Sequence, residues 1–268
     1  MLVQVGFFYA LLHWRARRRP PAYTLSEHDP LLRLRTISVI IPVYNEKHTI
    51  GPCIRTLVAH AVLGMDSVQV ICVDAGGSDD SMAAAAAMAK SLALRLTTAS
   101  SRGGRGPALN AGVQQATGDV ILVLHADTRL PRGWDAAILG GLAARGVLLT
   151  AFSFGTDRSQ LANPAVPPAG LGFMEWTVNL RSCWYELPFG DQALATTAAT
   201  LSAVGGFPDY PILEEYELVQ RLRALAAAGA GKLVTLPSAA LCSPRRWERV
   251  TVWRTNAINQ ARRNLGRH

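Results

Sequence analysis

The chain of 268 residues has few cysteines, and their spacing excludes the common zinc and disulfide frameworks. The four cysteines are Cys53, Cys72, Cys183 and Cys242. No two of them form a CxxC pair, and none has the spacing to histidine that a zinc site needs. Cys72 lies within an apolar run, where a reduced thiol packs as a small apolar side chain. We therefore expect a reducing compartment and no disulfide framework.

The sequence also lacks long apolar runs and is modest in charge. No apolar stretch reaches the ~18 residues of a membrane-spanning helix. Apolar residues make up 49% of the chain and charged residues 17%, which excludes disorder of the whole chain. The 27 Lys and Arg exceed the 19 Asp and Glu, so the net charge is +8. This excess fits an anionic ligand, a membrane surface or nucleic acid, but aromatic residues do not alternate with basic ones as nucleic-acid stacking would require.

Residues 1–34 differ in character from the rest of the chain. Residues 2–14 are mostly apolar and are followed by Arg15, Arg17, Arg18 and Arg19. No basic stretch precedes them, unlike in a secretory leader. A membrane-interface anchor, an organelle-targeting leader and a remnant of a longer gene model all fit this pattern. We expect the folded domain at residues 35–268.

Apolar runs and helical patterns alternate from residue 36 to Asp127. The expected strands are Ile37–Asn45, Val68–Asp74, Leu92–Thr97 and Val120–Asp127, and the expected helices include Glu46–Ala61, an alanine-rich helix after Ser78 or Asp79, and Pro107–Ala116. This alternation indicates a doubly wound α/β sheet.

The pattern changes after Leu130. We expect a strand at Ala151–Phe154, a mobile loop at Asn163–Gly172, and helices at Phe173–Trp184, Glu214–Ala228 and Val250–Leu265, the last of them basic. The helix at Glu214–Ala228 has its apolar residues on one face, as a helix packed against a core does.

Polar residues gather where the expected strands end. Tyr44–Asn45–Glu46 follows the first strand, Asp74 ends the second, and His125–Asp127 ends the fourth. Ligands bind at the carboxyl ends of strands in open α/β sheets. These side chains therefore predict a ligand site at one edge of the sheet.

Short motifs in a fixed order carry a family resemblance. They are PVYNE at 42–46, VDAGGSDD at 73–80, GDVILVLHAD at 118–127, LEEYEL at 213–218 and PRRW at 244–247. In this order they resemble the inverting glycosyltransferases of family 2, and the resemblance covers about Thr36 to Gly266. It implies a GT-A-like fold, a doubly wound mixed, mostly parallel sheet flanked by helices. It also implies a donor half near residues 35–130 and an acceptor half near 131–268.

A closer likeness is to the subgroup named transferase 2, radical-SAM/selenodomain-associated. The matching elements are Gly104–Arg105 with Asn110, His125–Ala126–Asp127, Gly190–Asp191–Gln192, Gly205–Gly206–Phe207 and Arg245–Arg246–Trp247. Ala108 departs from this subgroup, which has Gln at that place.

The resemblance implies a nucleotide-sugar donor, with UDP as the nucleotide by analogy. Pro42 and Tyr44 would form a wall for the base, and Glu46 and Asp74 would accept hydrogen bonds from the ribose or the base. The residues expected at the phosphates are Arg102, Arg105, the glycines Gly103, Gly104 and Gly106, and Asn110. Without the resemblance, Glu46 would be interpreted as a helix cap, Asp74 as a strand end and the glycine-rich segment as a solvated loop.

The resemblance also implies a divalent metal, Mn²⁺ or Mg²⁺, at the diphosphate. Asp127 is the expected ligand. His125 replaces the first acid of the usual DxD motif, and it is either a second ligand, which favours Mn²⁺, or a hydrogen-bond partner of the ribose. A structural histidine at a strand end is the third interpretation.

Inverting transfer needs a base for the acceptor hydroxyl. The base position falls on Glu215, next to Glu214, although the family has Asp there and Glu is one methylene longer. Asp191 and Gln192 are expected to shape the acceptor side. Arg245 and Arg246 would offset the diphosphate charge, and Trp247 would stack on a sugar ring.

The predicted function is transfer of a sugar with inversion from a nucleotide-diphosphate donor to an unknown hydroxyl acceptor by metal-assisted single displacement. A non-catalytic relic that binds nucleotide or sugar is the alternative. A sugar-nucleotide nucleotidyltransferase is a third, although PVYNE replaces its glycine-rich loop. The basic C-terminal helix suggests peripheral membrane contact and a lipid-linked acceptor. We expect the cytoplasm or the cytoplasmic face of a membrane, with organelle targeting left open by residues 1–34, and no nucleic-acid partner.

Overall fold

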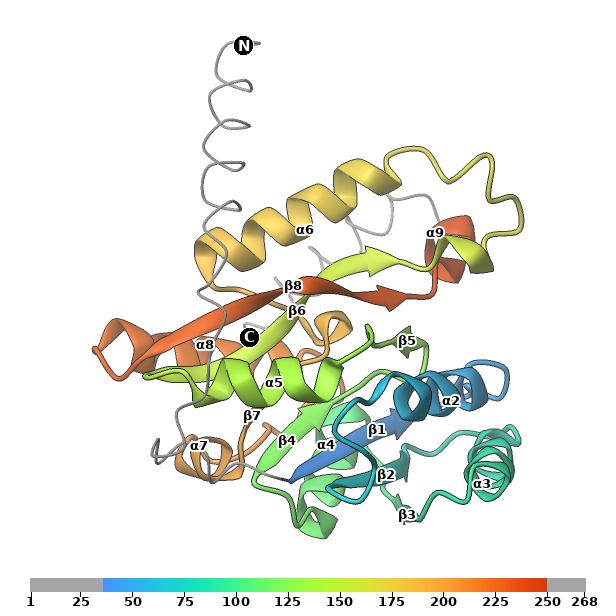
Figure 1. Cartoon of the computed structure of the whole chain (residues 1–268), viewed down its shortest axis with the longest axis horizontal. Coiled ribbons are helices and arrows are strands. Elements are labelled where there is room, and N and C mark those ends of the chain that lie inside the picture. Colours follow the sequence, from blue (N-terminus) through green and yellow to red (C-terminus); the bar gives the residue numbers. More distant parts are fainter. Residues whose placement is uncertain (1–35, 250–268) are drawn as a thin grey trace. The chain divides into compact units, whose positions relative to one another are not determined.

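A mixed sheet of eight strands is the centre of the described structure, and helices pack on both of its faces (Figure 1). The computed structural model describes residues 36–249. The expectations for residues 1–34 and for a helix at Val250–Leu265 lie outside these residues. The strand order is β3-β2-β1-β4-β7-β6-β8-β5. This arrangement confirms the predicted mixed, mostly parallel α/β sheet.

The first half alternates strand and helix as predicted. Its elements are β1 (Ile37–Val43), α2 (Ile50–His60), β2 (Val68–Asp74), α3 (Ser81–Ser91), β3 (Leu96–Ser100), α4 (Arg105–Gln115) and β4 (Val120–Val123). The four strands pair in parallel. β1 and β4 are buried throughout, which explains their continuous apolar runs.

Two boundaries in this half differ from the expectation. Helix α2 begins at Ile50 and not at Glu46, because Asn45 has a left-handed backbone (φ 54°) and turns the chain before the helix. Strand β3 begins at Leu96 and not at Leu92, because the amides of Leu92 and Leu94 still bond to carbonyls at the end of α3.

The second half adds antiparallel pairing. Its elements are β5 (Thr128–Arg129), α5 (Trp134–Ala143), β6 (Val147–Thr156), η2 (Arg158–Gln160), α6 (Leu171–Tyr185), η3 (Gly190–Gln192), β7 (Ala195–Thr197), α7 (Ala198–Ala203), α8 (Glu214–Ala227), β8 (Lys232–Cys242) and α9 (Arg245–Arg249). β7 lies antiparallel between β4 and β6, and β6 pairs in parallel with β8. Helices α5 and α7 and the short strands β5 and β7 were not predicted from the sequence.

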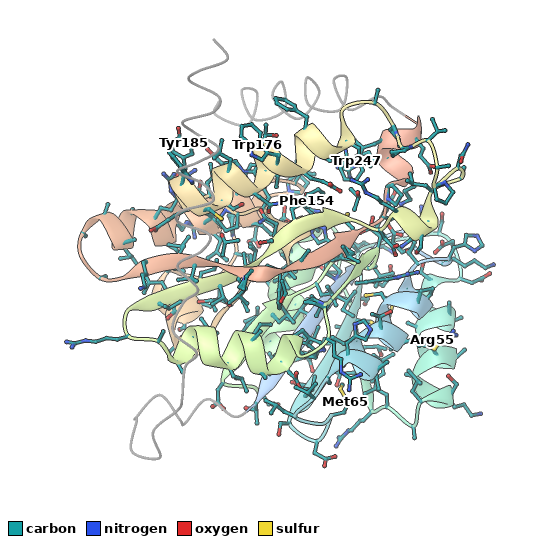
Figure 2. The ribbon with its side chains drawn as sticks, turned by 45° about the horizontal axis from the view of Figure 1, so that its top comes forward. Arg55, Met65, Phe154, Trp176, Tyr185 and Trp247 are labelled. Atoms are coloured by element: carbon teal, nitrogen blue, oxygen red, sulfur yellow. The ribbon has the colours of Figure 1, made fainter. Side chains whose placement is uncertain are left out.

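The core has one apolar cluster on each face of the sheet. Helices α2, α3 and α5 contribute to one cluster, and α4 and α8 to the other (Figure 1). A third, smaller cluster lies under α6, where the rings of Phe154 and Trp247 meet edge to face with centroids 5.9 Å apart (Figure 2). Within residues 36–249, no helix has the length and hydropathy to cross a membrane.

The parallel strands place their carboxyl ends at one edge. Val43 pairs with Asp74 across β1 and β2, and Ile40 pairs with Val123 across β1 and β4. The chain therefore leaves all three strands on the same side, and the segments 44–46, 75–80 and 124–127 start there. The predicted edge site is built from these segments.

Candidate active site

The segment 125–127 lies at the centre of the edge, between two groups of charged side chains. Asp127 contacts Arg245, which also contacts Glu46. His125 contacts Glu215, which also contacts Arg105. Residues from five separate parts of the sequence thus meet around one short loop.

The first group is an acidic pair joined by one guanidinium. Nη2 of Arg245 donates to Oε1 of Glu46 and lies 3.3 Å from Oδ2 of Asp127. The Glu46 and Asp127 side chains are only 17% and 20% exposed, so the contacts are partly shielded from water. Burial opposes the charge of Arg245, but the hydrogen bond to Glu46 and the two carboxylate charges outweigh it and raise the pKa of the guanidinium. The second oxygen of Glu46 accepts from the Thr49 hydroxyl.

The second group is a buried network around Glu215. Nε2 of His125 lies 3.0 Å from Oε1 of Glu215, and Nη2 of Arg105 lies 3.5 Å from Oε2. Arg105 also donates to Glu214 at 2.6 Å. The sequence brings both glutamates to the first turn of α8, where the helix dipole favours negative charge.

The protonation states within this network follow from burial and charge. Burial alone would raise the pKa of Glu215, but the charges of His125 and Arg105 hold it well below the usual range. Burial would lower the pKa of His125, but Glu215 raises it above 6.5. Burial and the neighbouring Glu215 charge raise the pKa of Glu214. Glu215 is therefore a carboxylate paired with both Arg105 and His125, with little basicity.

Asp191 differs from the two glutamates of this network because, among the described residues, its carboxylate has no ion pair and one of its buried oxygens has no hydrogen-bond partner. It lies in η3, directly after Gly190, whose backbone is pressed against Glu215: a Cβ at Gly190 would come 1.9 Å from Oε2. Within the described residues, Oδ1 of Asp191 is buried and has no hydrogen-bond partner. Burial raises the pKa of Asp191, and the positive charges of Arg181 and His125 only partly offset this effect.

The glycine-rich loop before α4 is partly packed, and two of its amides are not free for phosphate. The amides of Arg105 and Gly106 donate to the carbonyls of Pro211 and Tyr210, at 3.1 and 3.0 Å. A Cβ at Gly104 would come 2.4 Å from Cα of Pro211. Gly104 and Gly106 therefore allow two loops to pack closely, whereas Arg102 and Gly103 are exposed.

Four residues predicted at the site are buried or have partners within the protein. Pro42, expected beside the base, is buried within β1. Gln192, expected to shape the acceptor side, is fully buried and bonds to Phe152, Ser182 and Phe189. Trp247, expected to stack on a sugar ring, is 8% exposed and packs on Phe154 (Figure 2). Asn110 bonds to Phe207 and Asp209 and so fixes the loop after α7.

Two further predicted donor residues lie at the edge, together with Asn45. Tyr44 is 61% exposed. Asp74 uses one oxygen to accept from the amides of Gly76 and Gly77, which shapes the turn after β2. Asn45 accepts from the Ser78 amide and so joins the first and second edge loops. Arg246, in α9, is exposed.

Two functional contacts have no counterpart among the predictions from sequence. Thr49 holds Glu46, and Arg181 lies close enough to Asp191 to affect its pKa. Thr49 falls inside a stretch expected to be helix, and Arg181 inside a helix far from every motif. The sequence around Thr49 or Arg181 contains no motif that would predict these contacts.

The residues of this edge fit a divalent metal only in company with a phosphate ligand. Within residues 36–249, no three His, Cys, Asp or Glu side chains are grouped to hold a metal ion. Nε2 of His125 lies 3.0 Å from Oε1 of Glu215, so that nitrogen is engaged within the protein. Asp127 supplies one carboxylate, and Mg²⁺ commonly binds through one or two carboxylates together with substrate phosphates.

Comparisons with known proteins support the fold and point to one family. Residues 38–167 match the family model described as Glycosyl transferase family 2. The chain is 36% identical over 101 residues to undecaprenyl-phosphate 4-deoxy-4-formamido-L-arabinose transferase of Klebsiella pneumoniae (strain 342), which covers 37% of this chain and 31% of that protein. The homologous transferase of Sodalis glossinidius is 30% identical over 102 residues, again 37% of this chain and 31% of the relative. The chain thus spans about a third of the length of these relatives.

Solved structures resemble the chain over a longer stretch. A mannosyltransferase from Pyrobaculum calidifontis in complex with GDP-Man and Mn²⁺ gives a TM-score of 0.60 at 21% identity, over 90% of this chain and 66% of that one. Glucosyl-3-phosphoglycerate synthase from Mycobacterium tuberculosis, in complex with Mn²⁺, UDP and phosphoglyceric acid, gives 0.55 at 20% identity, over 84% and 76%. These likenesses confirm the predicted GT-A fold.

Proposed function

We propose that this chain, whose residues 38–167 match the family model Glycosyl transferase family 2, transfers a sugar from a nucleoside-diphosphate donor to an acceptor oxygen with inversion. The observation that carries this proposal is the meeting of Glu46, Asp127 and Arg245 at the carboxyl ends of β1, β4 and β8. Such an edge is where open α/β sheets bind their ligands.

The donor nucleotide lies, in this proposal, over the loops after β1 and β2. Tyr44 offers an exposed ring for the base, and Asp74 has a second carboxylate oxygen for a ribose hydroxyl. UDP is the first nucleotide to test, because a structural neighbour binds it, and GDP is the second for the same reason.

Charge on the leaving diphosphate is offset by a divalent metal and by arginines. A metal held by Asp127 and the phosphates would act as a Lewis acid. Arg245 and Arg246 stand at the start of α9 beside this place, and guanidinium groups bind phosphate oxygens in a fixed geometry.

The proton of the acceptor passes to Asp191 in this mechanism. The acceptor oxygen attacks the anomeric carbon, the bond to the diphosphate breaks with its electron pair on the diphosphate, and the proton goes to a carboxylate. Glu215, the base expected from the family, has both oxygens engaged by His125 and Arg105. Asp191 has an unpartnered oxygen and a raised pKa, which suit proton transfer better.

The paired Glu215 also favours a second candidate function. If Asp191 takes no proton, the site can bind a nucleotide sugar without transferring it, as a relic of the fold. Isothermal titration with UDP, with and without Mn²⁺, followed by a hydrolysis assay over a panel of UDP-sugars and GDP-mannose, separates the two. Binding with slow donor hydrolysis supports the transferase, and binding without any turnover supports the relic.

The acceptor is lipid-linked in this proposal. The curated relatives are named for undecaprenyl phosphate. Helix α6 exposes Phe173 and also Tyr185 (Figure 2), and aromatic side chains of this kind occur on membrane-facing surfaces. Flotation with anionic liposomes tests membrane contact, and no binding at low salt would exclude it.

A further inference from the structure

Arg245 holds two carboxylates that come from distant parts of the chain. Glu46 precedes it by 199 residues and Asp127 by 118 residues, yet a single guanidinium nitrogen contacts both. Two partly buried carboxylates on adjacent loops repel each other unless a cation lies between them. Among the described side chains, Arg245 supplies that cation.

The contact of Arg245 with Asp127 uses the same group that a metal ion needs. Oδ2 of Asp127 faces the guanidinium, and Oδ1 lies 4.0 Å from the thiol of Cys242. Both oxygens of Glu46 are also engaged, by Arg245 and by Thr49. A metal ion arriving alone therefore meets two carboxylates that already share one positive charge, and it must compete with the guanidinium for them.

A diphosphate changes this balance. It brings several anionic oxygens, which can serve as ligands of a metal ion and also as partners of a guanidinium. The Arg245 side chain is 39% exposed and lies in the first turn of α9, so it can exchange a carboxylate partner for a phosphate without unfolding its surroundings.

We propose that Arg245 is a resident cation of the donor site, which keeps Glu46 and Asp127 together and makes metal binding depend on the donor diphosphate. Metal and nucleotide then bind as a pair, and the site does not fill with free metal. This proposal rests on the proposed function for the identity of the diphosphate, but the role of Arg245 toward the metal can be tested without any turnover.

The test is a titration of the full chain with Mn²⁺, with and without UDP, in which electron paramagnetic resonance measures the free Mn²⁺. In the wild type, we expect weak binding of Mn²⁺ alone and much tighter binding with UDP. In Arg245→Gln, we expect binding of Mn²⁺ alone to tighten by roughly tenfold, the size of one partly shielded charge contact. Mn²⁺ alone should also raise the melting temperature of this variant more than that of the wild type.

Two further variants make the result specific. Arg245→Lys keeps the charge and should bind Mn²⁺ alone as weakly as the wild type. Arg158→Gln removes an exposed arginine that pairs with Glu175 at 3.1 Å outside the site, and it should leave Mn²⁺ binding unchanged.

The proposal is overturned if Arg245→Gln folds with a cooperative melt and binds Mn²⁺ alone no more tightly than the wild type. It is also overturned if Arg245→Gln does not fold while Arg245→Lys folds and binds Mn²⁺ alone tightly. Failure of UDP to bind the wild type, with or without Mn²⁺, would instead contradict the proposed function, and the binding of Mn²⁺ alone would still decide the role of Arg245.

Discussion

Nε2 of His125 lies 3.0 Å from Oε1 of Glu215, which is ninety residues further along the chain. The contact joins the loop after β4 to the first turn of α8. Asp127 lies two residues from His125. The contact between His125 and Glu215 therefore also joins the acidic group around Arg245 to the network around Glu215. The donor side and the acceptor side of the proposed reaction thus share one four-residue loop, 124–127.

The His125–Glu215 pair predicts a specific dependence of stability on pH. The folded pKa of His125 is raised above 6.5, so its contribution to stability is complete below 6.5 and is lost as pH rises through the folded pKa. The pKa of Glu215 is lowered, so its contribution is lost only at acidic pH, as pH falls through the folded value. The free energy of unfolding should therefore decline as pH rises above 6.5.

Urea unfolding of the wild type and of His125→Gln between pH 5.5 and 9 tests this prediction. The variant should lose the decline that the wild type shows. His48→Gln, which replaces an exposed histidine, should keep it. An equal decline in His125→Gln would mean that the pair does not titrate as the structure indicates.

Replacing Asp191 should separate binding from turnover. Asp191→Asn keeps the shape of the side chain but removes the proton acceptor, so we expect donor turnover to fall by roughly 10²–10⁴-fold. The dissociation constant for UDP with Mn²⁺ should stay within about twofold, since the proposed donor contacts lie elsewhere. Glu215→Gln should instead lower the melting temperature, because it removes the anionic partner of partly buried His125 and one of the two carboxylates that pair with Arg105. If Asp191→Asn keeps full turnover while Glu215→Gln folds stably but loses turnover, the base is Glu215 and not Asp191.

The close approach of Gly190 to Glu215 gives a packing prediction. An added Cβ in Gly190→Ala would lie 1.9–2.2 Å from the Glu215 carboxylate group, so the loop or the ion pair must shift. We expect a loss of about 1–3 kcal/mol in the free energy of unfolding. Gly140→Ala is the matched control: Gly140 lies in α5 with open space around its Cβ position, and the helix should gain about 0.5–1 kcal/mol. Equal stability of Gly190→Ala and the wild type, measured by urea unfolding, would mean that Glu215 is not held as closely as described.

Much of the first half of the fold could be predicted from sequence because its strands are buried on both faces. β1 and β4 are continuous apolar runs, and polar residues directly after them mark the edge of the sheet. The short strands β5 and β7 escaped prediction because two or three residues show no periodicity. The site residues His125, Asp127 and Glu215 were found through motifs that stay close in sequence.

The pairing among those residues could not be predicted, because it depends on contacts across the chain. The Arg245–Glu46 contact spans 199 residues, and nothing in either local sequence specifies the other. The glycine-rich loop was assigned to phosphate because its composition suits phosphate, whereas two of its amides bond to Pro211 and Tyr210 in a loop with no matching signal. The burial of Pro42 and Trp247 could likewise not be predicted, because their residue types alone suggest ligand contact.

The proposal that the sheet edge binds a metal-linked nucleoside diphosphate is tested most directly by titrating UDP in the presence of Mn²⁺. The comparison is between the wild type, Asp127→Ala and Asp66→Ala, the last of which changes an exposed acid at the opposite end of β2. We predict that the wild type and Asp66→Ala bind UDP with the same affinity and that Asp127→Ala binds at least about tenfold more weakly. Absence of UDP and GDP binding in the wild type, or equal UDP binding in Asp127→Ala, would contradict a donor site at this edge.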